Sequence, residues 1–125
     1  MDRIPLATYM EDSDGIPVLV AVGEIDLSTA SIFKKAISDM ISSGYQNLLI
    51  DMSQVVFMDS SGFGTLLSAI KVLRPQGGSL ALAGCNDAVN RMLEITRLNT
   101  LFHVYPDRAT AVQALRNQTG AAPAA

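Results

Sequence analysis

The stretch NLLIDMSQVVFMDSSGFGTLLSAIKVL, residues 47–73, joins two different hydrophobic patterns within one segment. Residues 47–52 form an almost continuous apolar run, which is typical of a strand buried on both faces of an α/β sheet. From Phe63 onward the apolar residues recur at helical spacing, and Pro75 ends that pattern. The segment therefore predicts a buried strand that passes directly into a helix.

The rest of the chain extends this alternation of strands and helices. Asp14-Gly15 favours an opening hairpin, because glycine tolerates positive φ. The expected strands are at 6–10, 18–22, 47–52, 79–84 and 101–105. The expected helices run through 32–41, from 63 to 73, from a point after Asn86, and through 107–116. Ser28 or Thr29 caps the first helix, and the third has Val89, Met92 and Leu93 inward. This order predicts an α/β fold, with a mixed, mostly parallel sheet of about five strands and about four helices.

The length and composition are those of one domain. The chain has 125 residues, of which 49% are hydrophobic, so it can bury a core without disulfides or metals. The segment 117–125, NQTGAAPAA, is small and polar. We expect residues 1–116 to form the domain and residues 117–125 to be a disordered tail.

Composition also disfavours several classes of function. The net charge is −3, and the nine Lys and Arg residues are scattered among acids, so no basic footprint for nucleic acid is present. The charged start of the chain is broken by Pro5, and the longest apolar run falls short of the ~18 residues that span a bilayer. Cys85 is the single cysteine and His103 the single histidine, which speaks against a disulfide framework or a metal site. We expect a cytoplasmic protein without membrane contact, metal or cofactor.

The turn Asp59-Ser60-Ser61-Gly62 lies where the central strand becomes a helix, and in a parallel sheet sites gather at such turns. One interpretation is purely structural, because Asp and Ser are preferred helix N-caps. A cap needs only one side chain, however, and leaves the second hydroxyl unexplained. The other interpretation is an accessible phosphoryl acceptor at a helix start, where Gly62 and Gly64 let a partner approach the backbone closely.

A second cluster, GEID at residues 23–26, ends the preceding strand with a glycine and two acids. Acids at this position suit a helix amino terminus and need no further function. If the two strands are neighbours, both turns open on the same edge of the sheet, and Glu24, Asp26, Asp59 and Ser60 share one acidic surface. Such a surface suits a partner with arginines, or a magnesium nucleotide that the partner binds.

Other chemistries have weaker support in the sequence. GFGTLL lacks the third glycine of a dinucleotide fingerprint, and no P-loop lysine follows. A serine nucleophile needs a base, and His103 lies in an apolar segment where a core or edge histidine is the simpler interpretation. Cys85 and the six methionines are interpreted as core residues.

GEIDLSTA (23–30) and VVFMDSSGFGTLLSAIK (55–71) together resemble the STAS domain of bacterial anti-sigma factor antagonists. The similarity extends to about Arg116, since the order of elements also fits. The resemblance implies a regulatory protein that is not an enzyme. In this family the unphosphorylated antagonist binds an anti-sigma factor with a GHKL-type serine kinase fold and frees a sigma factor.

The same resemblance assigns roles to individual residues. Ser60 matches the phosphorylated serine, and a PP2C-type phosphatase would restore the active form. The residues expected to contact the partner are Glu24, Asp26, Asp59, Ser61, Gly62 and Phe63. Two positions depart from the family pattern: Phe63 replaces the usual leucine, and Arg97 stands where glycine is usual, so Arg97 would be strained if that position needs positive φ.

Two other functions remain open at this point. An STAS subunit of a lipid-transport ATPase complex or a stressosome-like assembly would use the same edge for docking without phosphorylation. A small nucleotide-binding or hydrolytic enzyme would need a lysine and a base that the motif lacks. No large apolar face is left over, so we expect a monomer or a weak dimer.

Overall fold

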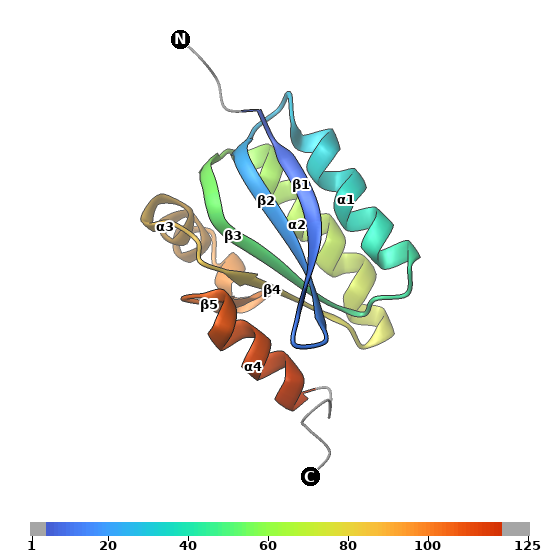
Figure 1. The fold of residues 1–125 in the computed structure, drawn as a ribbon. Helices are drawn as coiled ribbons and strands as arrows, with labels where there is room; N and C mark the ends of the chain where they lie inside the picture. Colours follow the sequence, from blue (N-terminus) through green and yellow to red (C-terminus); the bar gives the residue numbers. More distant parts are fainter. Residues whose placement is uncertain (1–4, 119–125) are drawn as a thin grey trace.

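A computed structural model describes residues 5–118 of the chain, and its helices cover both faces of one sheet (Figure 1). The strands are β1 (Ala7–Ser13), β2 (Ile16–Ile25), β3 (Asn47–Met58), β4 (Ser79–Ala83) and β5 (His103–Tyr105). The helices are α1 (Ala30–Ser42), α2 (Ser60–Leu73), α3 (Asp87–Ile95) and α4 (Arg108–Gln118), with 3-10 turns at Arg74–Gln76 and Leu98–Thr100.

The sheet has five strands in the order β1-β2-β3-β4-β5. Only the β1–β2 pair is antiparallel, and the other three pairs are parallel. The two-residue turn between Ser13 and Ile16 has positive φ at both Asp14 (52°) and Gly15 (85°), as a type I′ hairpin requires. The mixed, mostly parallel α/β fold and the opening hairpin are therefore confirmed.

Each face of the sheet has its own core. Helices α1, α2 and α3 pack on one face, where Phe33, Leu66 and Leu93 are buried with side chains of β3 and β4. Helix α4 covers the other face with Ala111, Val112 and Leu115. In Figure 1 the red-brown α4 lies on the opposite side of the sheet from the cyan α1. The near-continuous apolar run of residues 47–52 is explained by this burial on both faces.

Strand β2 continues beyond Gly23 to Ile25, farther than the sequence indicated. Gly23 has φ 118° and pairs with Val55, whereas Glu24 pairs with Phe57, so β3 carries an extra residue at this point. Such a bulge shifts the alternation of side chains between the faces. Its effect is that Val55 is buried while Phe57, two residues later on the strand, is exposed.

Several side chains that the pattern placed inside are on the surface. Met10 and Met92 are each between two-fifths and one-half exposed, so their interpretation as core residues is wrong, and the apolar Ile32 in the helix through 32–41 is exposed as well. Hydrophobic periodicity identifies the apolar side of a helix but does not tell how much of that side other elements cover.

At the carboxyl end of the chain, α4 continues through Gln118, so residues 117 and 118 are helical, and residues 119–125 lie outside the described part.

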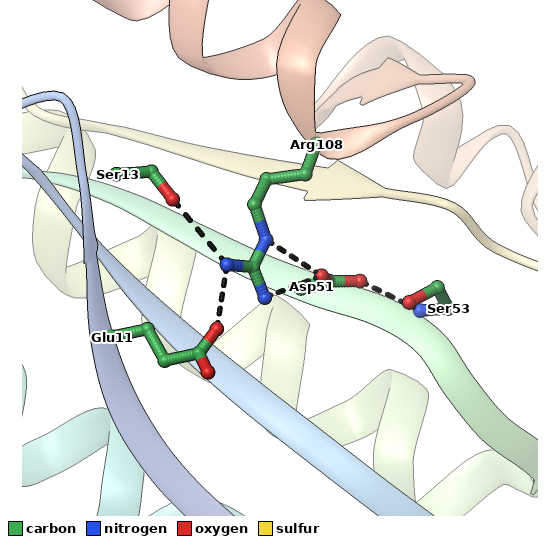
Figure 2. Close-up of polar contacts among 5 residues, drawn as sticks. All are labelled: Glu11, Ser13, Asp51, Ser53 and Arg108. Carbon is green, nitrogen blue, oxygen red and sulfur yellow. Dashed lines mark hydrogen bonds and ion pairs between the residues drawn. The ribbon is translucent and has the colours of Figure 1, made fainter.

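An ion-pair cluster that the sequence analysis missed joins α4 to the sheet (Figure 2). Asp51 on β3 is 5% exposed and accepts from Arg108 Nε and Nη2, each at 2.8 Å. Arg108 Nη1 lies 2.6 Å from a carboxylate oxygen of Glu11 on β1. Burial by itself would raise the pKa of Asp51, but hydrogen bonds from Ser53 and the charge of Arg108 outweigh it and hold that pKa below its ordinary value.

Candidate functional site

The GEID turn and the Asp-Ser-Ser-Gly turn lie side by side at one end of the sheet. Ile25 and Met58, the last residues of β2 and β3, are paired in register. Directly beyond them, the backbone N–H of Asp59 donates to the carbonyl oxygen of Ile25 at 3.0 Å. The expectation that both turns open on the same edge is therefore confirmed.

Asp59 is the N-cap of α2. Its backbone is extended, with φ −97° and ψ −172°, and its Oδ1 accepts from the backbone N–H of Ser61 at 2.8 Å. The aspartate alone thus satisfies one of the free N–H groups that every helix start presents. Neither serine is required for the cap, and the structural interpretation of the serines loses its main support.

The two serines differ in accessibility. Ser60 is the first residue of α2 and is exposed, whereas Ser61 is half-buried. The carbonyl oxygen of Ser61 also accepts from Thr65 Oγ1 at 2.9 Å, within the first turns of the helix. Of the two serines, Ser60 is therefore the more accessible to solvent.

The side chains of Asp26 and Thr29 organise the loop that follows β2. Asp26 Oδ1 accepts from the backbone N–H and the hydroxyl of Ser28, at 2.9 and 2.8 Å. The hydroxyl of Thr29, which is buried, donates to the carbonyl oxygen of Glu24 and accepts from the N–H of Asp26, both at 2.9 Å. Thr29 is the N-cap of α1, but its hydroxyl is used by this loop rather than by the helix.

Gly62 and Phe63 lie beneath the surface rather than on it. A Cβ at Gly62 would meet the side chain of Met58 and, at 2.9 Å, Ile25 Cγ2, so the glycine permits α2 to pack closely against β2 and β3. Phe63 is 6% exposed and belongs to the core. Only Gly64, where an added Cβ would meet no atom within 4 Å, fits the idea that a glycine leaves room for a partner.

A shallow groove of about 270 Å³ opens beside Ser60. We call it the β3–α3 groove, since the end of β3, the start of α2 and α3 form its walls. Its lining is mostly apolar, and none of the described residues that line it is a Lys, Arg or His. The lining residues are Val56, Phe57, Met58, Asp59, Ser60, Phe63, Asn86, Ala88, Val89 and Met92.

The residues considered for catalysis or metal binding are elsewhere. His103 is exposed on β5, which pairs with β4 and not with β3. Burial raises the pKa of the half-buried Cys85 thiol to about 11, so it is a poor nucleophile at neutral pH. Among residues 5–118, no group of three or more His, Cys, Asp or Glu could hold a metal ion.

Comparison with known proteins identifies the family, because residues 8–111 match the family model described as the STAS domain. The chain belongs to the STAS domain family. The resemblance inferred from GEIDLSTA and VVFMDSSGFGTLLSAIK is thereby confirmed. Within the described part of this STAS chain, no helix is both long and apolar enough to cross a membrane.

Named relatives place this STAS chain near bacterial regulators. It is 38% identical to an anti-sigma-B factor antagonist of Listeria monocytogenes over 102 residues, which cover 82% of this chain and 89% of the relative. The crystal structure of an anti-sigma factor antagonist from Mycobacterium paratuberculosis matches with a TM-score of 0.81 and 32% identity, covering 89% of this chain and 94% of that one.

The same fold also occurs in a transporter. The STAS domain of a SulP transporter from Vibrio cholerae matches with a TM-score of 0.65 and 25% identity, covering 84% of each chain. Fold alone therefore does not separate an anti-sigma factor antagonist from a domain of a transporter. The named relatives favour an anti-sigma factor antagonist. The mechanism is inferred from the surface around Ser60.

Proposed function

We propose that this STAS chain is an anti-sigma factor antagonist whose binding to its partner is switched off by phosphorylation of Ser60. The observation that carries the proposal is that Asp59, and not Ser60, caps the start of α2. Asp59 caps the helix through Ser61, while Ser60 stands exposed in the first turn with its hydroxyl not needed for that cap.

The electrostatics of this turn suit a switch. Phosphoserine carries about −1.5 to −2 charges at neutral pH, and Ser60 follows the carboxylate of Asp59 directly. The partial positive charge of the α2 amino terminus offsets part of that repulsion, so the fold tolerates the modification. The change falls on the surface that a partner meets, and a partner that fits an uncharged serine is repelled.

The other participants follow from the same proposal. The partner is an anti-sigma factor with a GHKL-type serine kinase fold, which binds the unphosphorylated protein and then transfers phosphate to Ser60. A PP2C-type phosphatase removes the phosphate. The protein itself acts in the cytoplasm as a ligand and substrate rather than as an enzyme. Glu24, Asp26, Asp59, Ser61, Gly62 and Phe63 form or support the contact surface.

Variants at the two serines test the switch. We expect Ser60→Ala to bind the kinase with the affinity of the unphosphorylated protein and to take up no phosphate. Ser60→Glu should bind at least about 10-fold more weakly, because it adds charge at the contact, and a tenfold change corresponds to about 1.4 kcal/mol. Ser61→Ala is the matched control and should retain phosphate uptake at Ser60.

The measurement combines capture and mapping. Immobilised Ser60→Ala and Ser60→Glu are exposed to a lysate of the native host, retained proteins are identified by mass spectrometry, and the affinity of the purified kinase is then measured by calorimetry. Equal affinity of the kinase for both variants contradicts the switch. Retention of the same transporter or assembly subunits by both variants, with Ser60 unmodified, would instead indicate a docking subunit.

A further inference from the structure

The β3–α3 groove exposes apolar side chains that the core does not use. Val56 and Phe57 are 53% and 49% exposed, because the extra residue in β3 turns both of them outward. Met92 on the facing α3 is 40% exposed. Contiguous exposed apolar surface beside a hollow is a common mark of an interaction site.

The groove is preformed. Asn86 caps α3, since its Oδ1 accepts from the N–H of Val89 at 2.9 Å. The same side chain donates through Nδ2 to the carbonyl oxygens of Val55 and Val56, at 3.3 and 3.4 Å. These bonds join the start of α3 to the end of β3, so the two walls keep their spacing and a ligand does not have to order them.

The position of the groove indicates its occupant. Ser60 is itself one of the lining residues. A stable protein interface covers about 800 Å² on each partner, so a kinase seated over the Ser60 hydroxyl covers the groove as well. Among residues 5–118, the lining contains no cationic side chain and only one carboxylate, that of Asp59, so it suits an uncharged aliphatic or aromatic side chain rather than an acidic one.

We propose that the β3–α3 groove receives an apolar side chain of the anti-sigma factor kinase, and that Ser60 at its rim controls this insertion. The proposal rests on the proposed function and adds to it the anchor by which the partner is held. A phosphate on Ser60 places about −1.5 to −2 charges where the apolar side chain enters, and desolvating that charge opposes the insertion.

Truncation of exposed lining residues tests the anchor. Phe57→Ala and Met92→Ala should each weaken binding of the purified kinase by about 5-fold to 30-fold, which is more than the near-neutral contacts around an anchor lose on truncation. Val72→Ala is the matched control, because Val72 is 47% exposed on the carboxyl-terminal half of α2 and does not line the groove. It should bind within about 2-fold of the wild type, since exposed truncations away from an anchor are nearly neutral.

Affinity is measured by calorimetry with unphosphorylated full-length protein, and urea unfolding checks that each variant is folded. A second variant, Ala88→Trp, fills the groove without adding charge and should weaken binding at least as much. The proposal is overturned if the wild type binds and is phosphorylated on Ser60 while Phe57→Ala, Met92→Ala and Ala88→Trp all bind normally. In that case the proposed function stands and only the anchor is wrong.

Two further results would also overturn the anchor. If the wild type neither binds the kinase nor accepts phosphate at Ser60, the proposed function fails and the anchor fails with it. If the free wild type sediments as a dimer and Phe57→Ala or Met92→Ala sediments as a monomer, the occupant is a second copy of the chain rather than the kinase.

Discussion

At the scale of single residues, Arg97 carries a visible conformational cost. It lies two residues beyond Ile95, the last residue of α3, with φ 60° and ψ 18°, in the left-handed region, as expected for a position where glycine is usual. Its N–H donates to the carbonyl oxygen of Glu94 at 3.1 Å, and its own carbonyl oxygen accepts from the hydroxyl of Thr100 at 2.7 Å. These bonds hold the turn in a conformation that costs a residue with a Cβ about 1 kcal/mol.

Arg97→Gly should therefore raise the free energy of unfolding by about 1 kcal/mol. Part of this gain is offset because glycine raises the conformational entropy of the unfolded chain. Urea unfolding monitored by circular dichroism measures the change. Arg91→Gly is the matched control, since Arg91 is exposed in the middle of α3 and the same substitution there should cost about 1 kcal/mol. Destabilisation by both substitutions would show that Arg97 is not strained.

The sequence pattern alone does not distinguish Ser60 from Ser61 as the phosphate acceptor. Both hydroxyls are chemically equivalent in the sequence, and only the resemblance to the STAS family favoured Ser60. The structure adds a physical distinction, because Asp59 bonds the backbone of Ser61 while the side chain of Ser60 faces solvent. The choice of Ser60 as acceptor stays a prediction, and phosphate mapping decides it.

At the scale of elements, α2 approaches the sheet so closely that its first turn has no room for a side chain at Gly62. The nearest atoms to an added Cβ belong to Met58 at the end of β3 and Ile25 at the end of β2. The sequence suggested that Gly62 and Gly64 both serve access. The structure separates them, since one glycine is needed for packing inside the protein and the other faces open space.

Gly62→Ala should destabilise the protein by about 1–3 kcal/mol, because overpacking displaces buried side chains. Gly64→Ala should instead stabilise it by about 0.5–1 kcal/mol, since alanine is the better helix former and meets no neighbour. Thermal unfolding of the two variants side by side measures the difference. A Gly62→Ala variant as stable as the wild type would contradict the close contact of α2 with Met58 and Ile25.

The order and type of the elements were predictable, because each is specified by local spacing of apolar residues, by turn dipeptides and by caps. The ends of elements were less predictable. The strand pattern stopped at Val22, but β2 runs to Ile25 because pairing with β3 extends it past Gly23. The bulge in β3 has no local signal, although it decides that Val56 and Phe57 face outward.

At the scale of the whole molecule, the cluster of Glu11, Asp51 and Arg108 holds α4 against the sheet (Figure 2). These residues come from β1, β3 and the start of α4. The cluster therefore links β1 and β3 to α4. Loss of Arg108 would leave the buried Asp51 carboxylate with an uncompensated desolvation cost.

Asp51→Asn should cost about 2–3 kcal/mol of stability at neutral pH, because it removes the charge that pairs with Arg108. The pKa of Asp51 is lower in the folded protein than its ordinary value of 3.8, so the stabilisation is complete above that value and is lost as pH falls through the lower, folded value. Urea unfolding at about pH 6.5 and about pH 3 should show the gap between wild type and variant shrinking in acid.

Asp39→Asn supplies the control for this prediction. Asp39 pairs with Lys35 at 3.0 Å on the surface of α1, where both side chains are mostly exposed. Surface pairs contribute about 0–1 kcal/mol to stability, so the free energy of unfolding of this variant should stay close to that of the wild type at either pH. An Asp51→Asn variant that behaves like Asp39→Asn would show that the cluster does not stabilise the docking of α4.

The sequence by itself determined the alternation of strands and helices, the hairpin at Asp14-Gly15 and the two turns that carry the family motif. Each of these depends on residues within one turn or one strand of each other. Only the tertiary structure decided that Asp51 meets Arg108 and that β3 and α3 enclose a groove beside Ser60. These features depend on which distant segments become neighbours, and local patterns of hydrophobicity contain no information about such contacts.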